Sequence, residues 1–168
     1  ETPFLVLSDG YHGHGDEWVS LTKPHEGVPP VHALIRPLLA DFNDAHIAEA
    51  DAVILEPVIV DASDDRRAWL SRLRDTCTRT GTVLIFEEVI SGFRWPQFSV
   101  ATNWGITPDL ICLGKAIANG MPLAAVGGKY DIMNCGEYFV SSTYAGETLS
   151  LASAIATMNL LQKEMSID

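Results

Sequence analysis

The sequence has few basic residues, no long apolar run and few cysteines. It contains 11 Lys and Arg against 22 Asp and Glu among 168 residues, a formal net charge of −11 at pH 7. Nucleic-acid phosphates attract a basic protein face, so this balance argues against a nucleic-acid partner. No run approaches the roughly 18 consecutive apolar residues of a membrane span, and no signal-peptide pattern opens the chain. We therefore expect no membrane partner.

The cysteines Cys77, Cys112 and Cys135 are odd in number and have no CxxC spacing. This pattern is typical of inert, reduced thiols rather than of a disulfide framework, so we expect a cytoplasmic protein. The hydrophobic content of 47% is ample for a core, and 168 residues fit a single domain.

Short apolar runs alternate with helical stretches along the chain. Four runs rich in Val, Ile, Leu and Phe are predicted strands: Phe4–Leu7, Ala52–Leu55, Val83–Phe86 and Leu110–Leu113. Continuous apolar runs of this kind suit parallel strands buried on both faces. A further strand, which can run antiparallel, is predicted over Leu123–Val126, and residues 20–43 form the longest irregular stretch.

Two helices complete the pattern. The first is predicted over Asp64–Thr80, with Ser63 or Asp64 as its N-cap and Gly81 after its end. The second is predicted over Thr148–Lys163. Because a strand, a helix and a strand follow one another, a parallel pair with a right-handed crossover is expected. The predicted fold class is α/β, a mostly parallel sheet flanked by helices.

Lys115 follows the fourth apolar run directly after Gly114, and a loop of small residues comes next. A lysine just past a buried strand is expected to be partly desolvated, which favours the neutral amine that a Schiff-base nucleophile needs. The alternative is an ordinary solvated loop lysine. Glu56 and Glu87 also lie at the ends of apolar runs. In open α/β sheets, sites form beyond the carboxyl ends of the strands, so these three residues are candidate site residues.

Five segments in a fixed order carry a resemblance to a known family: Tyr11-His12-Gly13-His14, Leu55-Glu56-Pro57-Val58, Ile85–Arg94, Pro108–Lys115 and Thr143-Tyr144-Ala145-Gly146. In these segments the chain resembles the class III aminotransferases, the pyridoxal 5′-phosphate (PLP) family that includes glutamate-1-semialdehyde aminomutase. The resemblance implies the large PLP-binding domain of a fold type I enzyme. Residues 1–168 would be its central part, without the N-terminal phosphate loop and the C-terminal small domain.

The resemblance also implies an activity and an assembly. Such an enzyme transfers an amino group between a small amine or amino acid and a carbonyl compound, and it works as a homodimer with shared active sites. Transaminase and aminomutase both remain open. By the same resemblance Lys115 forms a Schiff base with PLP, Glu87 keeps the pyridine nitrogen protonated, and Val89 and Tyr11 contact the two faces of the ring. His12 follows Tyr11, as it does in the family.

Further roles come from the same match. Thr143 corresponds to a threonine that hydrogen-bonds the phosphate of the neighbouring subunit's cofactor. Glu56 lies by the site, and Asp61 falls near a position that hydrogen-bonds the ring hydroxyl. Arg94 is expected to be a structural ion-pair partner rather than a substrate clamp.

The chain departs from the family pattern at two places. Glu87 stands where the family nearly always has aspartate, and Glu147-Thr148 follows Gly146 where the aminomutase has Asn-Pro. A glutamate keeps the charge, but its extra methylene moves the carboxylate, and a misplacement near 1 Å can cost on the order of 100-fold in rate. Other interpretations are that Glu87 is a surface carboxylate capping the next segment and that Val89 is a core residue.

Two alternative functions remain. The chain can be a non-catalytic, truncated or degenerate homologue, in which case residues 1–168 do no chemistry. His12, His14 and Asp16 also have the HxHxD spacing of metallo-β-lactamase-type zinc hydrolases, although Glu17 stands where that family has histidine. The main prediction, a PLP-dependent enzyme, includes no metal site.

Overall fold

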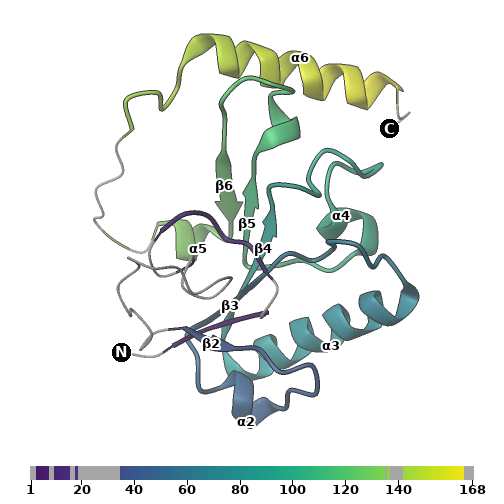
Figure 1. The fold of residues 1–168 in the computed structure, drawn as a ribbon, viewed down its shortest axis with the longest axis vertical. Helices are drawn as coiled ribbons and strands as arrows, with labels where there is room; N and C mark the ends of the chain where they lie inside the picture. Colours follow the sequence, from purple (N-terminus) through teal and green to yellow (C-terminus); the bar gives the residue numbers. More distant parts are fainter. Residues whose placement is uncertain are drawn as a thin grey trace. The chain divides into compact units, whose positions relative to one another are not determined.

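The computed structural model describes residues 3–7, 10–15, 18, 35–134, 136 and 142–164. The chain divides into two compact units, Glu1–Glu87 and Glu88–Asp168. Figure 1 follows the chain through both units by colour. Within the described ranges, no helix is long and apolar enough to cross a membrane.

The described strands of the first unit run parallel in the order β2-β1-β3-β4. Their bounds are Phe4–Val6 for β1, Ile35–Pro37 for β2, Ala52–Leu55 for β3 and Val83–Glu88 for β4. Leu5, Val53 and Leu84 are almost completely buried on these strands. Burial on both faces explains why the strands read as continuous apolar runs.

Helix α3 (Asp64–Thr80) connects β3 to β4. It begins at Ser63, whose side chain accepts a hydrogen bond from the Arg66 N–H, and it ends at Gly81, where φ is +77°. A side-chain cap and a left-handed glycine are the usual signals at the two ends of a helix. Leu70, Leu73 and Cys77 form its buried face, as their spacing predicts.

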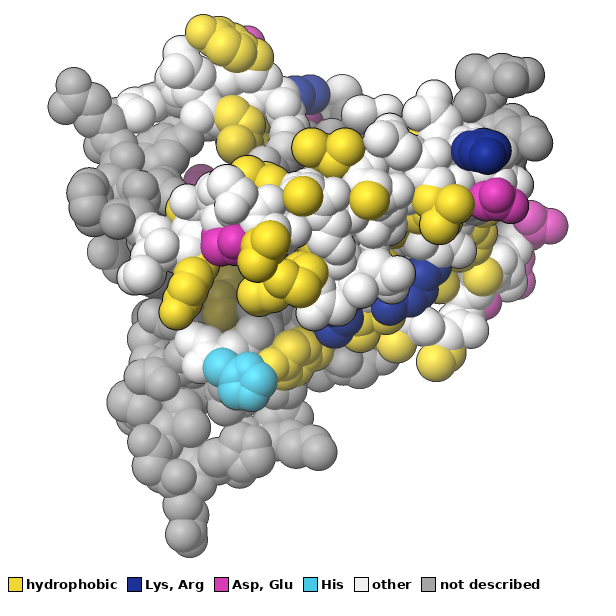
Figure 2. All heavy atoms as spheres, turned by 90° about the horizontal axis from the view of Figure 1, so that it is seen from above, with side chains coloured by type: hydrophobic (Ala, Val, Ile, Leu, Met, Phe, Trp, Pro, Cys, Tyr) yellow, Lys and Arg dark blue, Asp and Glu magenta, His cyan; other side chains and the backbone are white. Residues whose placement is uncertain are grey.

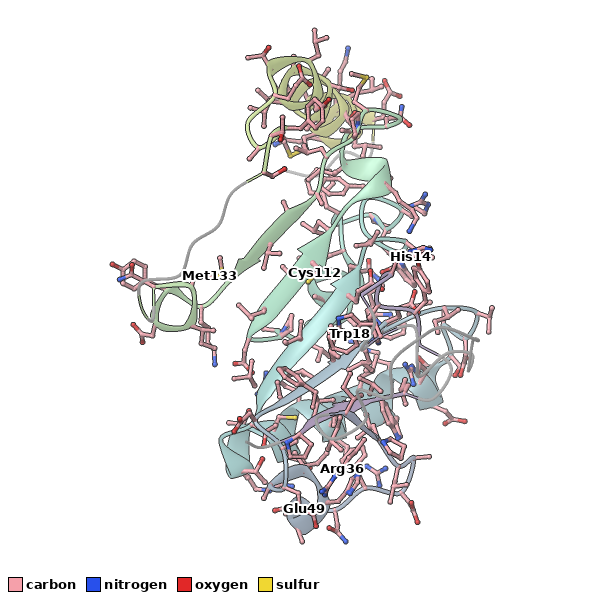
Figure 3. All side chains as sticks on the ribbon, turned by 60° about the vertical axis from the view of Figure 1, so that its left-hand side comes forward. His14, Trp18, Arg36, Glu49, Cys112 and Met133 are labelled. Atoms are coloured by element: carbon pink, nitrogen blue, oxygen red, sulfur yellow. The ribbon has the colours of Figure 1, made fainter. Side chains whose placement is uncertain are left out.

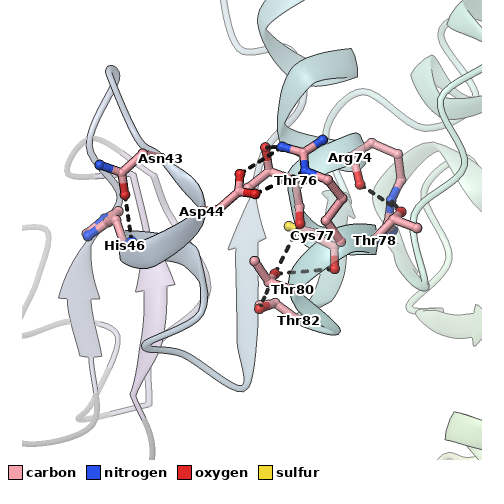
Figure 4. A network of polar contacts seen from close by, with 10 residues as sticks. Asn43, Asp44, His46, Arg74, Thr76, Cys77, Thr78, Thr80 and Thr82 are labelled. Atoms are coloured by element: carbon pink, nitrogen blue, oxygen red, sulfur yellow. Dashed lines mark hydrogen bonds and ion pairs between the residues drawn. The ribbon is translucent and has the colours of Figure 1, made fainter.

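The short helix α2 (Asp44–Ile47) is joined to the end of α3 by polar contacts, which Figure 4 shows. The Arg79 guanidinium donates to both carboxylate oxygens of Asp44, at 2.7 and 3.0 Å, and lowers the pKa of that carboxyl. Both side chains are exposed, so this pair contributes little to stability. The buried Thr82 hydroxyl donates to the Ile47 carbonyl.

The second unit contains an antiparallel strand pair and several helices. Its elements are α4 (Val100–Trp104), β5 (Leu110–Leu113), η1 (Lys115–Ile117), β6 (Ala125–Gly128), α5 (Tyr130–Met133) and α6 (Thr148–Glu164). Leu110 pairs with Gly128, and Leu113 pairs with Ala125. A Cβ at Gly128 would lie 2.3 Å from the Asp109 carbonyl oxygen, so only glycine fits there.

The structure confirms most of the predicted elements and corrects several. The bounds of β3, β5 and α3 are as predicted. The last predicted strand lies two residues later, over Ala125–Gly128, and it runs antiparallel. β4 continues to Glu88, and β2, α2 and α4 occur where no element was predicted.

Candidate active site

The carboxyl ends of β1, β3 and β4 lie at one edge of the parallel strands, because Val6 pairs with Ile54 and Leu55 pairs with Phe86. Glu56 comes directly after β3, is buried, and accepts a 3.1 Å hydrogen bond at Oε2 from the Tyr11 backbone N–H. This contact ties the segment after β1 to the end of β3. The structure therefore brings together four predicted site residues at this edge: Tyr11, His12, Glu56 and Glu87.

His12 and Glu87 are a buried pair within this group. Their side chains are 3% and 10% exposed, and His12 Nδ1 lies 3.8 Å from Glu87 Oε2, beyond hydrogen-bond range. Among the described residues, neither ring nitrogen of His12 has a hydrogen-bond partner. Burial lowers the pKa of His12, which favours the neutral imidazole. A buried ring without partners is costly, so this corner is suited to a bound polar group.

Two contacts that involve aromatic side chains lie beside the pair of His12 and Glu87. The ring of Trp18 meets the His12 ring edge to face at a centroid distance of 5.6 Å. The Tyr11 hydroxyl lies 2.5 Å from His14 Nδ1, and this pair is exposed. Figure 3 labels His14 and Trp18.

Glu88 has a structural role that the sequence did not reveal. Its carboxylate is fully buried and accepts hydrogen bonds from the backbone N–H groups of Val100 and Ala101, at 2.8 and 2.9 Å. The Ser91 hydroxyl donates to the same group at 3.0 Å. The carboxylate therefore satisfies the first free N–H groups of α4. The capping role considered for Glu87 thus belongs to Glu88, while Glu87 is buried rather than on the surface.

Lys115 lies two residues beyond the end of β5, as the first residue of η1, and its φ is +42°. It lines an open hollow of about 390 Å³ together with Arg94, Ala116, Asn119, Gly120, Met121 and Pro122. The expected partial desolvation is wrong for the described chain, because Lys115 is exposed. The chain turns away after Gly114, and the residues around the hollow do not cover the side chain.

Val89 packs against Gly114, the residue that precedes Lys115. A Cβ on Gly114 would lie 3.1 Å from Val89 Cγ1, which is tighter than ordinary packing. The glycine therefore lets the half-buried Val89 approach the end of β5 closely. This contact supports the packing interpretation of Val89 and leaves the ring contact a prediction.

Asp61 and Thr143 are exposed. Asp61 Oδ1 accepts the Ser63 N–H at 2.9 Å, and hydrogen bonding to Ser63 lowers the pKa of the Asp61 carboxyl. Asp61 therefore has a local role at the start of α3. Thr143 opens the turn of residues 143–146 before α6. The cofactor contacts of both residues stay predictions.

Arg94 corrects another expectation. In the described part of the chain its Nη1 donates to the backbone carbonyls of Ile90 and Gly92, and no carboxylate pairs with it. The predicted structural ion pair is therefore wrong for these residues.

The zinc alternative finds no support in the described ranges. They contain no group of three His, Cys, Asp or Glu side chains that could hold a metal ion. His14 contacts Tyr11, whereas His12 is buried beside Glu87. Asp16 lies outside the described residues.

Comparison with known proteins decides the family. The family described as "Aminotransferase class-III" matches residues 1–168. The chain belongs to the class-III aminotransferases. It is 38% identical to glutamate-1-semialdehyde 2,1-aminomutase of Nitratidesulfovibrio vulgaris over 91% of its length, and 37% identical to that of Nitrosospira multiformis over 90%. The chain spans 41% of the length of each of these relatives.

Solved structures agree with the family assignment. A structure described as a transaminase with PLP bound superposes with a TM-score of 0.81 and 26% identity, over 97% of this chain and 44% of that one. The β-phenylalanine aminotransferase of Variovorax paradoxus gives a TM-score of 0.80 and 26% identity, over 99% and 41%. The predicted α/β class, with mostly parallel strands flanked by helices, is confirmed.

Proposed function

We propose that the protein containing this chain is a PLP-dependent enzyme that transfers an amino group, as an aminotransferase or an aminomutase. Its substrates would be a small amine or amino acid and a carbonyl compound. The observation that carries the proposal is the place of Lys115, two residues beyond β5 in an open hollow, in a chain that the family matches from end to end. Residues 1–168 would be the central part of the PLP-binding domain and weakly active or inactive alone.

The residues present fit PLP, the cofactor of class-III aminotransferases. Lys115 offers an exposed amine, Glu87 a buried carboxylate, and His12 a buried imidazole with no hydrogen-bond partner among the described residues. Tyr11 and Val89 offer an aromatic and an apolar surface. When bound, PLP supplies an electron sink for the substrate carbon that loses a proton. The proposal that all these groups serve one cofactor rests on the family match.

The roles of the chain's own side chains follow from their chemistry. Lys115 Nζ would bind the cofactor covalently and, once released, move the proton at the reacting substrate carbon. The Glu87 carboxylate would hold a proton on the pyridine nitrogen, because a nearby negative charge favours a cation. Glu56 would orient Tyr11 through the backbone hydrogen bond between them.

We further propose a cytoplasmic homodimer in which each site includes Thr143 of the other subunit. Thr143 is exposed, as a residue that reaches a second subunit must be. The helix that follows it exposes a set of large apolar side chains: Leu149, Leu151, Ile155, Met158 and Leu160. Figure 2, viewed from above, shows hydrophobic side chains at the surface. Among the described residues, Cys77 and Cys112 form no disulfide, which is compatible with the cytoplasm.

The test compares the complete gene product with its Lys115→Ala variant, and uses Lys163→Ala as a matched control in another exposed lysine. With PLP added, amino transfer from an amino acid to a keto acid and isomerisation of glutamate-1-semialdehyde are measured separately. We expect one of the two activities, lowered at least about 100-fold by Lys115→Ala and unchanged by Lys163→Ala. A wild-type protein inactive in both assays would favour the non-catalytic homologue.

The same assay tests Glu87. Replacement by Gln keeps the size of the side chain and removes its charge, so activity should fall by about 100-fold. Replacement by Asp keeps the charge. If Glu87 acts through its charge, the activity of Glu87→Asp should stay well above the activity of Glu87→Gln.

A further inference from the structure

Several residues in or near the hollow that contains Lys115 have a strained backbone with positive φ. Four non-glycine residues in the described ranges have a positive φ: Phe93 (+59°), Phe98 (+64°), Lys115 (+42°) and Asn119 (+45°). Such conformations are uncommon for side-chain-bearing residues and cluster at functional sites. Lys115 and Asn119 line the hollow, and Phe93 directly precedes Arg94, which also lines it.

The loop that carries Arg94 is closed by its own contacts. The Phe93 N–H donates to the Phe98 carbonyl at 2.6 Å, and the two rings lie 5.7 Å apart. The Arg94 N–H donates to the Ser91 carbonyl at 3.2 Å. The backbone of Arg94 is therefore held in place, although its side chain is exposed.

The guanidinium of Arg94 has unused donors. Its contacts to the Ile90 and Gly92 carbonyls, within the described residues, use Nη1 alone. Nε and Nη2 have no hydrogen-bond partner in the part of the chain that the structure describes. A guanidinium fork matches the two oxygens of a carboxylate.

The charge of the hollow points to an anion. Its lining has two cationic side chains, Arg94 and Lys115, and the amide of Asn119, and the described residues that line it include no Asp or Glu. Such a lining is unusual in a chain with a net charge of −11. If Lys115 reacts through its amine, Arg94 is left as the group that binds a negative charge beside it.

We propose that Arg94 binds a carboxylate of the amino-acid or keto-acid substrate in the hollow that it shares with Lys115. This inference rests on the proposed function, and it makes Arg94 a residue that sets substrate specificity. The enzyme would then prefer substrates with a carboxylate over amines that lack one.

The test uses the complete gene product loaded with PLP, its Arg94→Gln and Arg94→Lys variants, and Arg36→Gln as a control. Arg36 is exposed and pairs with Glu49 at 3.5 Å, outside the residues that line the hollow. Figure 3 labels both residues of this pair. The probes are L-alanine and ethylamine, which differ by one carboxylate, and the change in the PLP absorption spectrum reports reaction with each.

For Arg94→Gln we expect kcat/KM with alanine to fall about 10- to 100-fold, mostly through KM, while the reaction with ethylamine changes less than about threefold. For Arg94→Lys, kcat/KM with alanine should lie between the values for wild type and Arg94→Gln, because lysine keeps the charge and lacks the guanidinium fork. Propionate binding, followed by calorimetry, should weaken to the same extent in Arg94→Gln. Arg36→Gln should resemble wild type.

Other outcomes overturn the inference in distinguishable ways. Equal losses for alanine and ethylamine, together with a weaker Kd for PLP, would place the cofactor phosphate on Arg94 instead. No change in any measurement would assign Arg94 a purely structural role. Borohydride labelling of Lys115 by PLP separates these failures from failure of the proposed function, since only the latter abolishes the label in the wild-type protein.

Discussion

His12 Nδ1 lies 3.8 Å from Oε2 of Glu87, and both side chains are almost fully removed from solvent. The distance is too long for a hydrogen bond, and the imidazole has no other partner among the described residues. The Glu87 side chain therefore ends beside a histidine whose burial favours the neutral imidazole. A small movement of the imidazole, or a bound polar molecule, would give the His12 ring a hydrogen bond.

The buried His12 should make stability depend on pH. Its pKa is lowered from 6.5 by burial, so below about pH 6.5 the unfolded chain binds a proton that the folded chain does not. The stability that this difference confers is fully present above pH 6.5 and is lost as the pH falls toward the lower, folded pKa. The free energy of unfolding, measured by urea denaturation, should therefore fall more between pH 7.5 and pH 5.0 for wild type than for His12→Phe.

His46→Phe serves as the control for this measurement. His46 is half-buried in α2 and takes no part in the pair of His12 and Glu87, so its replacement should leave the difference between the two pH values close to that of wild type. An equal pH dependence in wild type and His12→Phe would contradict the assignment of a buried, neutral His12.

Glu88 should contribute more to stability than a surface carboxylate does. Glu88→Ala leaves the N–H groups of Val100 and Ala101 unsatisfied and opens a cavity, so we expect a loss of about 3 kcal/mol or more. Glu49→Ala, at an exposed site, should cost less than about 1 kcal/mol. Urea denaturation of both variants makes the comparison, and similar small losses would show that Glu88 does not hold α4.

Gly114 and Val89 should be energetically coupled. Gly114→Ala brings a Cβ to 3.1 Å from Val89 Cγ1 and should cost about 1–3 kcal/mol through overpacking. Val89→Ala removes the atom that is approached, so Gly114→Ala should cost less than about 1 kcal/mol in that background. A double-mutant cycle on unfolding free energies measures the difference. Additive losses would mean that the two residues do not meet in solution.

The fold could be predicted largely because its main elements carry strong local signals. For α3, the cap at Ser63, the left-handed Gly81 and the spacing of the buried residues all agree, so its bounds were correct. β3 and β5 were equally clear as short apolar runs. β2 was missed because it is three residues long and ends in Pro37, a residue that cannot donate to a ladder.

The candidate site was predicted less completely, for physical reasons. That Glu56, Glu87 and Lys115 follow strands is visible in the sequence. Which of two adjacent glutamates is fully buried is not, because successive strand residues point to opposite faces and tertiary packing decides which face holds α4. The exposure of Lys115 and the backbone partners of Arg94 likewise depend on loops that turn at positive φ, for which the residues Phe93 and Lys115 give little sequence signal.

The most direct measurement is the site of covalent attachment of PLP. The complete gene product is incubated with PLP, reduced with borohydride, digested and analysed by mass spectrometry, alongside Lys115→Ala and Lys163→Ala. We predict one pyridoxyl group on the peptide that contains Lys115, retained in Lys163→Ala and lost in Lys115→Ala. A label on another lysine, or none on the wild-type protein, would contradict the assignment of Lys115 as the residue that holds the cofactor.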